Sequence, residues 1–498
     1  MPEKTMIIIG AGVGGLATGC YAQMNGYRTQ IFEMHALPGG VCTAWKRKGY
    51  TFDGCIHHLA GCQPEHRQYR IWEELGAMPR PILHPEELVQ VEDPSGKRLT
   101  VYADLDRLAQ QMKELAPTDI KVIDELVRAA KGFRRFDLTS LMVGSPVDMA
   151  KVLPVLLPRW KWMTVTMAEA AQRFGDPFLK RAFPVIQYGA PANPVATLLN
   201  MLAQCETRNF GWPVGGSLAF AQDIAHRYLD LGGQIHYKAR VDKILVDNDR
   251  AVGVRLADAL DGTGGSEHRA DVVVSNIYGR STVMELLAGR YADERLRALY
   301  ALPLDESGGL QVSLGVRRDL SQELHTIGLL LEQPVTMADR AYDYLPLQLF
   351  GLDPSMAPPG KGTIKVELPT RYSYWRALYQ DREQYAAEKQ SVAETVIGQL
   401  EPRFPGLKGQ VEAVDVATPM TSERYTGNGP AFAGGLNLSL PALLTGKQHV
   451  RTLPGLAAFY MVGQWAGFPG LHLVAAMGRG LVQFLCKQDG KRFVPHDS

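Results

Sequence analysis

The stretch that decides the fold is Met6–Gly15, MIIIGAGVGG, near the start of a chain of 498 residues. Within it, Met6–Ile9 is a short apolar run rich in β-branched residues, which predicts a buried parallel strand. The glycines that follow match G-x-G-x-x-G and lead into a helix of small residues, Leu16–Asn25, which ends at Gly26. A second strand at Thr29–Phe32 completes a predicted βαβ unit of about 30 residues.

The glycines of this turn have separate roles in holding a dinucleotide. Gly10 permits the tight turn, Gly12 lets the backbone approach a pyrophosphate, and Gly15 lets the helix pack on the strand. The amides at the start of the helix then face the phosphates. Glu33 ends the second strand, where an acidic side chain fits a ribose hydroxyl and would repel a 2′-phosphate. The pattern predicts a dinucleotide site; the alternative is a glycine-rich turn without a ligand.

A second glycine pair, Gly39-Gly40, follows shortly after this acid. It indicates more backbone held close to a larger cofactor, although an ordinary loop turn would have the same composition. Only one G-x-G-x-x-G pattern supports a dinucleotide site, so a separate NADPH domain is not predicted.

Composition excludes several other classes of protein. Lys plus Arg is 53 and Asp plus Glu is 52, so the net charge of +1 gives no electrostatic argument for binding nucleic acid. The six cysteines contain no Cys-x-x-Cys pair, which argues against a zinc ribbon or a disulfide scaffold. The opening MPEKTMIII enters an apolar strand directly, and we expect a cytoplasmic protein. Phe459–Cys486 carries only one charge, but its glycines and proline favour strand, turn and buried helix over a membrane span.

The rest of the chain predicts an α/β fold in which a Rossmann-like domain is assembled from three segments. These segments are residues 1–75, 205–295 and 452–498, and residues 76–204 and 296–451 form an inserted α+β substrate domain. Residues 64–207 look mostly helical. The further predicted strands are Ile235–Val246, Ala251–Leu256, Ala270–Ser275, Gly309–Val316, Thr363–Leu368 and Leu456–Val462, and the helices are Leu105–Leu115, Asp119–Ala130, Ser217–Leu231, Asp381–Leu400 and Val474–Lys487.

The chain resembles the phytoene desaturase family of FAD-dependent oxidoreductases, which includes carotenoid desaturases, carotenoid isomerases and retinol saturases. At the N-terminal end, the resemblance lies in Glu33 followed by Leu37-Pro38-Gly39-Gly40, and then in Gly49–Gly54, GYTFDG. The other similar stretches follow in the family's order: Pro213–Gly216, Ala239–Val241, Ala251–Val254, Asp271–Asn276, Thr418–Thr421, Arg424–Asn428, Tyr460–Trp465 and Gly478-Arg479. The resemblance implies an architecture shared with flavin amine oxidases and with Rab GDP-dissociation inhibitors.

The resemblance also implies FAD as the cofactor and a set of residues that hold it. Val241 would meet the adenine through its backbone, and Gly463 would approach the ribityl chain. The start of the last helix would direct its positive end at the flavin N1 and O2 edge, where reduced flavin carries negative charge. The implied cofactor-binding residues are Gly10, Ala11, Gly12, Gly14, Gly15, Glu33, Met34, Gly39, Gly40, Val41, Cys42, Val241, Asn276, Gly463, Gln464, Leu473 and Val474.

Two departures from the family pattern bear on catalysis. Cys55–Cys62, CIHHLAGC, replaces a stretch that is usually rich in small residues, and Gly470–Leu473, GLHL, replaces a glycine-rich approach to the last helix. His57, His58 and His472 are therefore candidate catalytic residues that could move a proton near neutral pH. The alternative is that they are structural. Because the Cys/His spacing matches no recognised metal site, no metal is predicted.

These features predict an FAD-dependent enzyme that exchanges a hydride between flavin N5 and a carbon–carbon bond of a long apolar substrate, isoprenoid or carotenoid-like. Desaturation, saturation and cis–trans isomerisation all stay open, as do the final electron acceptor and the oligomeric state. The alternatives are a flavin amine oxidase and a non-enzymatic lipid carrier similar to the Rab GDP-dissociation inhibitors. Val152–Met163 combines apolar residues, two Trp and two cations, which suits either peripheral contact with a membrane or a core helix pair.

Overall fold

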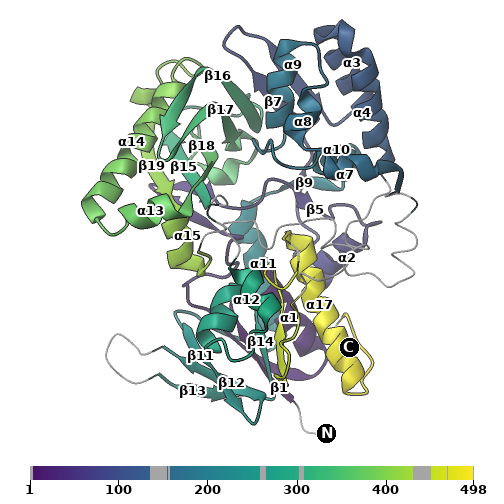
Figure 1. The fold of residues 1–498 in the computed structure, drawn as a ribbon, viewed down its shortest axis with the longest axis vertical. Coiled ribbons are helices and arrows are strands. Elements are labelled where there is room, and N and C mark those ends of the chain that lie inside the picture. Colours follow the sequence, from purple (N-terminus) through teal and green to yellow (C-terminus); the bar gives the residue numbers. More distant parts are fainter. Residues whose placement is uncertain are drawn as a thin grey trace.

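A computed structural model describes residues 4–134, 154, 157–257, 265–301, 305, 308–429, 450–467 and 469–496. The molecule is elongated, with a parallel sheet and its helices at one end (Figure 1). A seven-stranded sheet and a group of helices lie side by side at the other end.

The parallel sheet joins parts of the chain that are far apart in sequence. Its strand order is β10-β2-β1-β14-β20, and all neighbours are parallel. The strands are β1 (Lys4–Ile9), β2 (Tyr27–Phe32), β10 (Gln234–His236), β14 (Val272–Ser275) and β20 (Phe459–Met461). The last four residues of β1 are buried, as expected for a central strand covered on both faces. The predicted α/β class with a Rossmann-like sheet built from three segments is confirmed, while the domain boundaries themselves stay a prediction.

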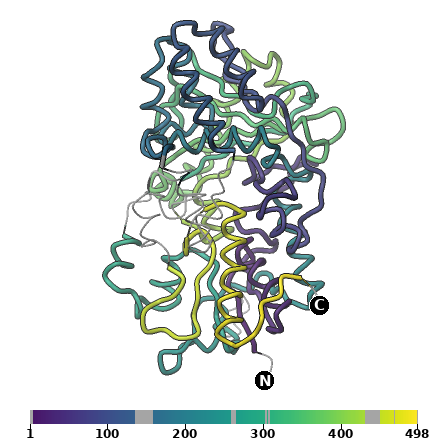
Figure 2. The backbone as a smooth tube through the Cα atoms, turned by 90° about the vertical axis from the view of Figure 1, so that its right-hand side faces the viewer, coloured from purple at the N-terminus to yellow at the C-terminus, as the bar shows by residue number. Residues whose placement is uncertain are grey.

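Helices from both ends of the chain pack together on this sheet. α1 (Val13–Met24) lies against α17 (Leu471–Gln488) and α11 (Gly216–Asp230), and Figure 2 shows the yellow C-terminal helix beside the purple N-terminal segment. The contact between α1 and α17 needs a glycine, because a Cβ at Gly478 would lie 2.9 Å from the Gly14 carbonyl oxygen. Gly478 of α17 therefore lets the last helix approach the backbone at the start of α1.

After β10 the chain leaves the parallel sheet and forms a second, antiparallel sheet. It consists of β11 (Val241–Asp247), β12 (Arg250–Leu256) and β13 (Glu267–Arg269). The prediction of one strand at Ile235–Val246 is wrong, because Lys238 adopts a left-handed backbone conformation (φ 56°) that ends the parallel pairing.

The second half of the molecule contains the seven-stranded sheet. Its order is β19-β15-β18-β17-β16-β7-β8, and only the β16–β7 pair is parallel. Its strands are β7 (Glu87–Glu92), β8 (Arg98–Tyr102), β15 (Gly308–Val316), β16 (Thr326–Met337), β17 (Arg340–Leu349), β18 (Gly362–Thr370) and β19 (Val411–Ala417). The helices beside it are α13 (Tyr372–Leu378), α14 (Arg382–Leu400) and α15 (Pro419–Thr426).

The predicted helical region has its own apolar core, but it is not all helical. Its helices are α3 (Leu105–Leu115), α4 (Ile120–Gly132), α7 (Trp160–Thr164), α8 (Met167–Ala171), α9 (Pro177–Ala182) and α10 (Val195–Glu206). The prediction is wrong over residues 82–102, which form β6 (Ile82–Leu83), β7 and β8. Leu88, Val89 and Val91 are buried because these strands extend the seven-stranded sheet at the β16 edge.

Six further short elements complete the description of the strands and α-helices. They are β3 (Ala44–Arg47), β4 (Tyr50–Asp53), β5 (Leu59–Ala60), α2 (Arg67–Glu74), β9 (Phe210–Pro213) and α12 (Glu294–Tyr300).

The two stretches with a membrane-like composition behave differently. Within Val152–Met163, residues 152, 153, 155 and 156 lie outside the described residues. In α7, Trp160 is 38% exposed while Trp162 is buried. Over the described part of the chain, no helix is both long enough and apolar enough to cross a bilayer.

Candidate cofactor and substrate site

A cavity of about 1240 Å³ lies at the carboxyl ends of the parallel strands. The residues that follow four of these strands line it: Gly10 after β1, Glu33 after β2, Asn276 after β14 and Gly463 after β20. Ligands of doubly wound sheets bind at this edge. Residues of α13 and α15, from the other half of the molecule, complete the wall.

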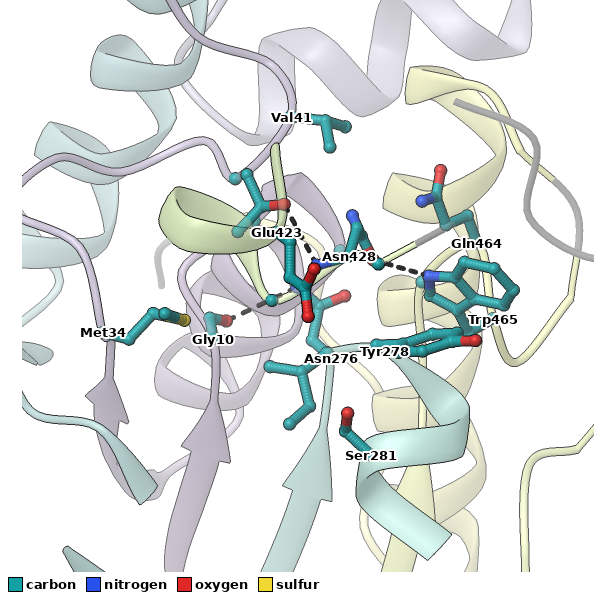
Figure 3. Close-up of a pocket in the computed structure, with 18 of the residues that line it drawn as sticks. Gly10, Met34, Val41, Asn276, Tyr278, Ser281, Glu423, Asn428, Gln464 and Trp465 are labelled. Atoms are coloured by element: carbon teal, nitrogen blue, oxygen red, sulfur yellow. Dashed lines mark hydrogen bonds between the residues drawn. The ribbon is translucent and has the colours of Figure 1, made fainter. Parts of the chain in front are cut away.

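Three glycines form a cradle around the side chain of Asn276; Figure 3 shows this side chain beside Gly10. A Cβ at Gly12, Gly14 or Gly463 would lie 2.9, 2.6 or 2.5 Å, respectively, from an amide atom of Asn276. A side chain at any of these positions would therefore have to displace the Asn276 amide. Gly10 needs its glycine for another reason, because its φ of 94° is in the left-handed region.

The start of α1 meets this cradle with its backbone amides available. Gly12 is the N-cap and makes no side-chain cap, and the first turn of the helix contains no acidic residue. An amide-lined helix start without a competing carboxylate suits a phosphate group. The cradle and the helix start together fit the pyrophosphate of a dinucleotide, as the sequence predicted.

Glu33 lies buried at one end of the cavity with Met34 and Val241. Its two carboxylate oxygens accept the N–H groups of Ala11 (2.7 Å) and His35 (2.8 Å). Burial raises the pKa of Glu33. Each oxygen keeps the capacity for a second donor, and a ribose hydroxyl provides one.

The second glycine pair packs directly on the first glycine turn. Gly39 donates its N–H to the Ala11 carbonyl (2.8 Å), and its φ of 106° requires glycine. A Cβ at Gly40 would lie 3.3 Å from the Gly12 Cα atom. The two turns therefore form one continuous backbone surface along the cavity.

His57 and His58 line a further part of the cavity, together with Tyr188. His58 Nδ1 hydrogen bonds the Tyr188 hydroxyl (2.5 Å), and the His57 ring lies 4.2 Å from the Tyr188 ring. His57 Nε2 is 3.7 Å from a carboxylate oxygen of Glu367. Nδ1 of His57 is buried and has no hydrogen-bond partner among the described residues. The side chain as a whole is 24% exposed and lines the cavity with its other ring atoms.

Both histidines are neutral at pH 7. Burial, with a contribution from the Lys365 ammonium, lowers the pKa of His57 well below its usual value. Burial also lowers the pKa of His58 to about 3. Each ring therefore carries one proton that it can donate in a hydrogen bond, while its other nitrogen accepts.

The neutral histidines predict that the protein loses stability in acid. His325 is the best probe, because it does not line the cavity and burial lowers its pKa to about 4. Unfolded, it titrates near pH 6.5, so below that pH the unfolded state binds more protons and stability falls with pH. The loss approaches about 1.4 kcal/mol per pH unit between the two pKa values and vanishes above pH 7.

Urea unfolding at pH 7, 6 and 5 tests this expectation. Between pH 7 and pH 5, the free energy of unfolding of His325→Gln should fall less steeply than that of the unmutated protein. The difference in slope should be at most about 1.4 kcal/mol per pH unit. His226→Gln, exposed on α11, is the matched control and should follow the unmutated protein. Parallel curves for His325→Gln and the unmutated protein would contradict a neutral, buried His325.

Four of the predicted residues do not line the cavity: Ala11, Gly15, His472 and Leu473. Ala11 contributes through its backbone, as described above. Gly15 packs the helix on the turn, since a Cβ there would lie 2.1 Å from the Gly10 carbonyl oxygen.

At the start of α17, Leu471 and Val474 line the cavity instead of His472 and Leu473. Positions three apart on a helix share a face, so the residues between them point elsewhere. The placement of His472 gives no support to a catalytic role. The other predicted site residues line the cavity: Gly10, Gly12, Gly14, Glu33, Met34, Gly39, Gly40, Val41, Cys42, His57, His58, Val241, Asn276, Gly463, Gln464 and Val474.

The cavity also contains residues to which the sequence assigned no role. The Trp465 indole N–H donates to the Asn428 side-chain oxygen (2.8 Å), and the Trp465 ring packs edge-on against Tyr278 (4.5 Å; Figure 3). Asn428 and Trp465 each end a stretch that resembles the family, which was the available signal. Tyr188 lies in no such stretch, and only the fold brings it to His58.

Comparisons with known proteins agree with this fold and site. Residues 8–75 match the model of the NAD(P)-binding Rossmann-like domain. The chain is similar to prolycopene isomerase of Daucus carota, at 25% identity over 96% of this chain and 79% of the relative. It is similar to all-trans-retinol 13,14-reductase of Homo sapiens (25%; 93% and 82%) and to lycopene-forming phytoene desaturase of Pseudescherichia vulneris (27%; 94% and 96%). The resemblance to the phytoene desaturase family is thereby confirmed over nearly the whole chain.

Solved structures show the same fold at lower identity. An oxidoreductase from Methanosarcina mazei has a TM-score of 0.59 at 17% identity, covering 96% of this chain and all of that one. Cyclohexylamine oxidase from Brevibacterium oxydans has a TM-score of 0.60 at 14% identity, covering 98% of this chain and all of that one. The cavity therefore belongs to a dinucleotide-binding fold that is shared by oxidoreductases.

Proposed function

We propose that this protein is an FAD-dependent oxidoreductase that acts on carbon–carbon bonds of a long apolar polyene, of the carotenoid or isoprenoid class. One observation carries the proposal: a single cavity runs along both glycine turns and includes the two neutral histidines and Tyr188. The similar isomerase, reductase and desaturase, whose names refer to prolycopene, retinol and phytoene, support this substrate class.

We propose FAD as the dinucleotide that this cavity holds. Glu33 and Val241 would hold the adenosine end, and the glycine cradle would hold the pyrophosphate. Beyond the cradle, the wall continues through Val41, Gln464 and the start of α17, which offers a positive helix end for a flavin ring. Bound FAD would supply two-electron chemistry that no side chain provides.

The residues of this chain would position the substrate and exclude water. The His57 ring, which lines the cavity, would hold or accept a proton beside the substrate. His58 and Tyr188 share one hydrogen bond and fix each other's orientation. Desaturation, saturation and isomerisation all need a positioned polyene and a controlled proton, so these residues suit each outcome.

Anaerobic incubation with defined substrates tests the proposed reaction. The purified protein, both as isolated and after reduction with dithionite, is mixed with phytoene, a poly-cis carotene or retinol, and separately with putrescine and cyclohexylamine. We expect at least one polyene to be converted, as judged by chromatography of the products, and both amines to leave the flavin absorbance unchanged. Denatured protein with free FAD is the control. Bleaching by an amine with no conversion of any polyene would instead support an amine oxidase.

We also propose a cytoplasmic location with peripheral contact to membranes. A polyene substrate dissolves in the apolar interior of a bilayer, so an enzyme that acts on it benefits from contact with the surface. The exposed Trp160 and the neighbouring Lys161 of α7 are residue types that suit the headgroup region.

A further inference from the structure

Two cysteine side chains face each other at the edge of the cavity. Cys42 and Cys55 both line it, and the Cys55 thiol is near enough to Cys42 to raise the pKa of Cys42. They flank the hairpin of β3 and β4, in which Ala44 pairs with Asp53. Two residues beyond this pair lie Cys42 on one side and Cys55 on the other.

The backbone geometry of this position suits a disulfide. The paired strands end at Ala44 and Asp53, and one further hydrogen bond, from the N–H of Gly54 to the Thr43 carbonyl (2.9 Å), joins the residues next to the cysteines. Paired residues of an antiparallel hairpin have Cα atoms about 4.5–5.5 Å apart, and each cysteine lies one residue beyond the hydrogen-bonded Thr43 and Gly54, so the two backbones start close together. A disulfide joins Cα atoms about 4.4–6.8 Å apart.

The surroundings make the two thiols unequal. Cys42 is fully buried, and its thiol donates to the Ser217 carbonyl (3.3 Å). The nearby Cys55 thiol and burial raise the pKa of Cys42, which keeps this thiol protonated. Cys55 is only half-buried. A small oxidant that enters the cavity therefore reaches Cys55 first.

We propose that Cys42 and Cys55 form a redox-active dithiol that a peroxide converts to a disulfide. The Cys55 sulfur attacks one oxygen of hydrogen peroxide, which yields a sulfenic acid and one water. The Cys42 sulfur then displaces the hydroxyl group of the sulfenic acid, and the Cys42 proton leaves with it as a second water. In sum, two thiols and one peroxide become one disulfide and two waters, and the peroxide is the species reduced.

The disulfide would fasten the second glycine turn to the histidine segment. Gly39 and Cys42 belong to one turn, since the Cys42 N–H donates to the Gly39 carbonyl (3.0 Å), and Gly39 is bonded in turn to Ala11. Cys55 lies two residues before His57. The bridge would restrict the backbone along the cavity, so we expect the dinucleotide to leave the oxidised protein several-fold more slowly. This consequence rests on the proposed function, whereas the formation of the disulfide does not.

Peptide mapping of the full-length protein tests the dithiol. The reduced protein is treated with hydrogen peroxide, alkylated and digested with trypsin, which cuts after Lys46 and Lys48 and so separates Cys42 from Cys55. We expect a linked pair of peptides about 2 Da lighter than their sum, reversible with dithiothreitol. Cys62 shares the second peptide with Cys55, so Cys62→Ser is the matched control and should keep the link.

The order of the two steps has its own readout. In Cys42→Ser, where no partner thiol is left, dimedone should label Cys55 as the trapped sulfenic acid. In Cys55→Ser, neither the link nor a dimedone label on Cys42 should form. Complete alkylation of both cysteines after peroxide, or a link that survives in Cys55→Ser, would overturn the proposal.

Measuring the bound dinucleotide together with the disulfide link distinguishes a failure of the dithiol proposal from a failure of the proposed function. A linked protein that holds no dinucleotide would disprove the proposed function and leave the dithiol intact. A protein that holds its dinucleotide but never forms the link would disprove the dithiol alone.

Discussion

Gly12→Val is expected to give a folded protein that purifies without its dinucleotide. The backbone of Gly12 has φ −65°, which any residue can adopt, so the change adds no backbone strain. The nearest neighbour of the new Cβ is the end of the Asn276 side chain (2.9 Å), which can move aside. The valine methyl groups would then occupy the space in which the pyrophosphate approaches the backbone.

The expected loss is at least about 100-fold in affinity, or about 2.7 kcal/mol. The measurements are the ratio of cofactor to protein after gel filtration and the midpoint of thermal unfolding without cofactor. Gly398→Val in α14 is the matched control, because no other group lies within 4 Å of a Cβ there. Gly12→Val protein that retains a full complement of cofactor would show that the ligand does not lie along this turn.

His57→Ala is expected to leave the cofactor bound and to slow turnover about 100-fold or more. The reason is the position of His57, whose side chain lines the cavity beyond the glycine turns and is 24% exposed. Because burial already holds the ring neutral, its loss removes a donor and acceptor and not a charge.

Turnover of the converted polyene and the flavin spectrum of the variant are measured side by side. The loss should fall on kcat more than on KM, and His57→Gln, which restores a hydrogen-bonding group, should recover part of it. His226→Ala on the exposed face of α11 should behave as the unmutated protein does. Unchanged turnover in both His57→Ala and His58→Ala would remove this pair from the mechanism.

The parts of the fold that local sequence determines were predictable. The strand, glycine turn and helix at residues 6–25 follow from apolar runs and glycines that have few other conformations open to them. The strand at residues 87–92 was not predicted, because its burial depends on pairing with β16, more than 230 residues later. The end of the parallel strand before Lys238 was not predicted either, because a lysine in the sequence does not indicate a left-handed backbone conformation.

The site shows the same division. Gly12, Gly14 and Glu33 act within one short segment, so their type and spacing reveal what they can hold. Tyr188 and Glu367 contact the histidines only through the tertiary structure, because they are distant from His57 and His58 in the sequence. His472 illustrates the limit of a local argument, since one helical position decides whether a side chain lines the cavity.

The identity of the bound molecule tests the central claim most directly. The protein is purified without added cofactor and denatured, and the released small molecules are identified by chromatography and mass spectrometry. We predict FAD, at about one molecule per chain. Release of NAD alone, or of no dinucleotide from a protein that also takes up no added FAD, would contradict the account.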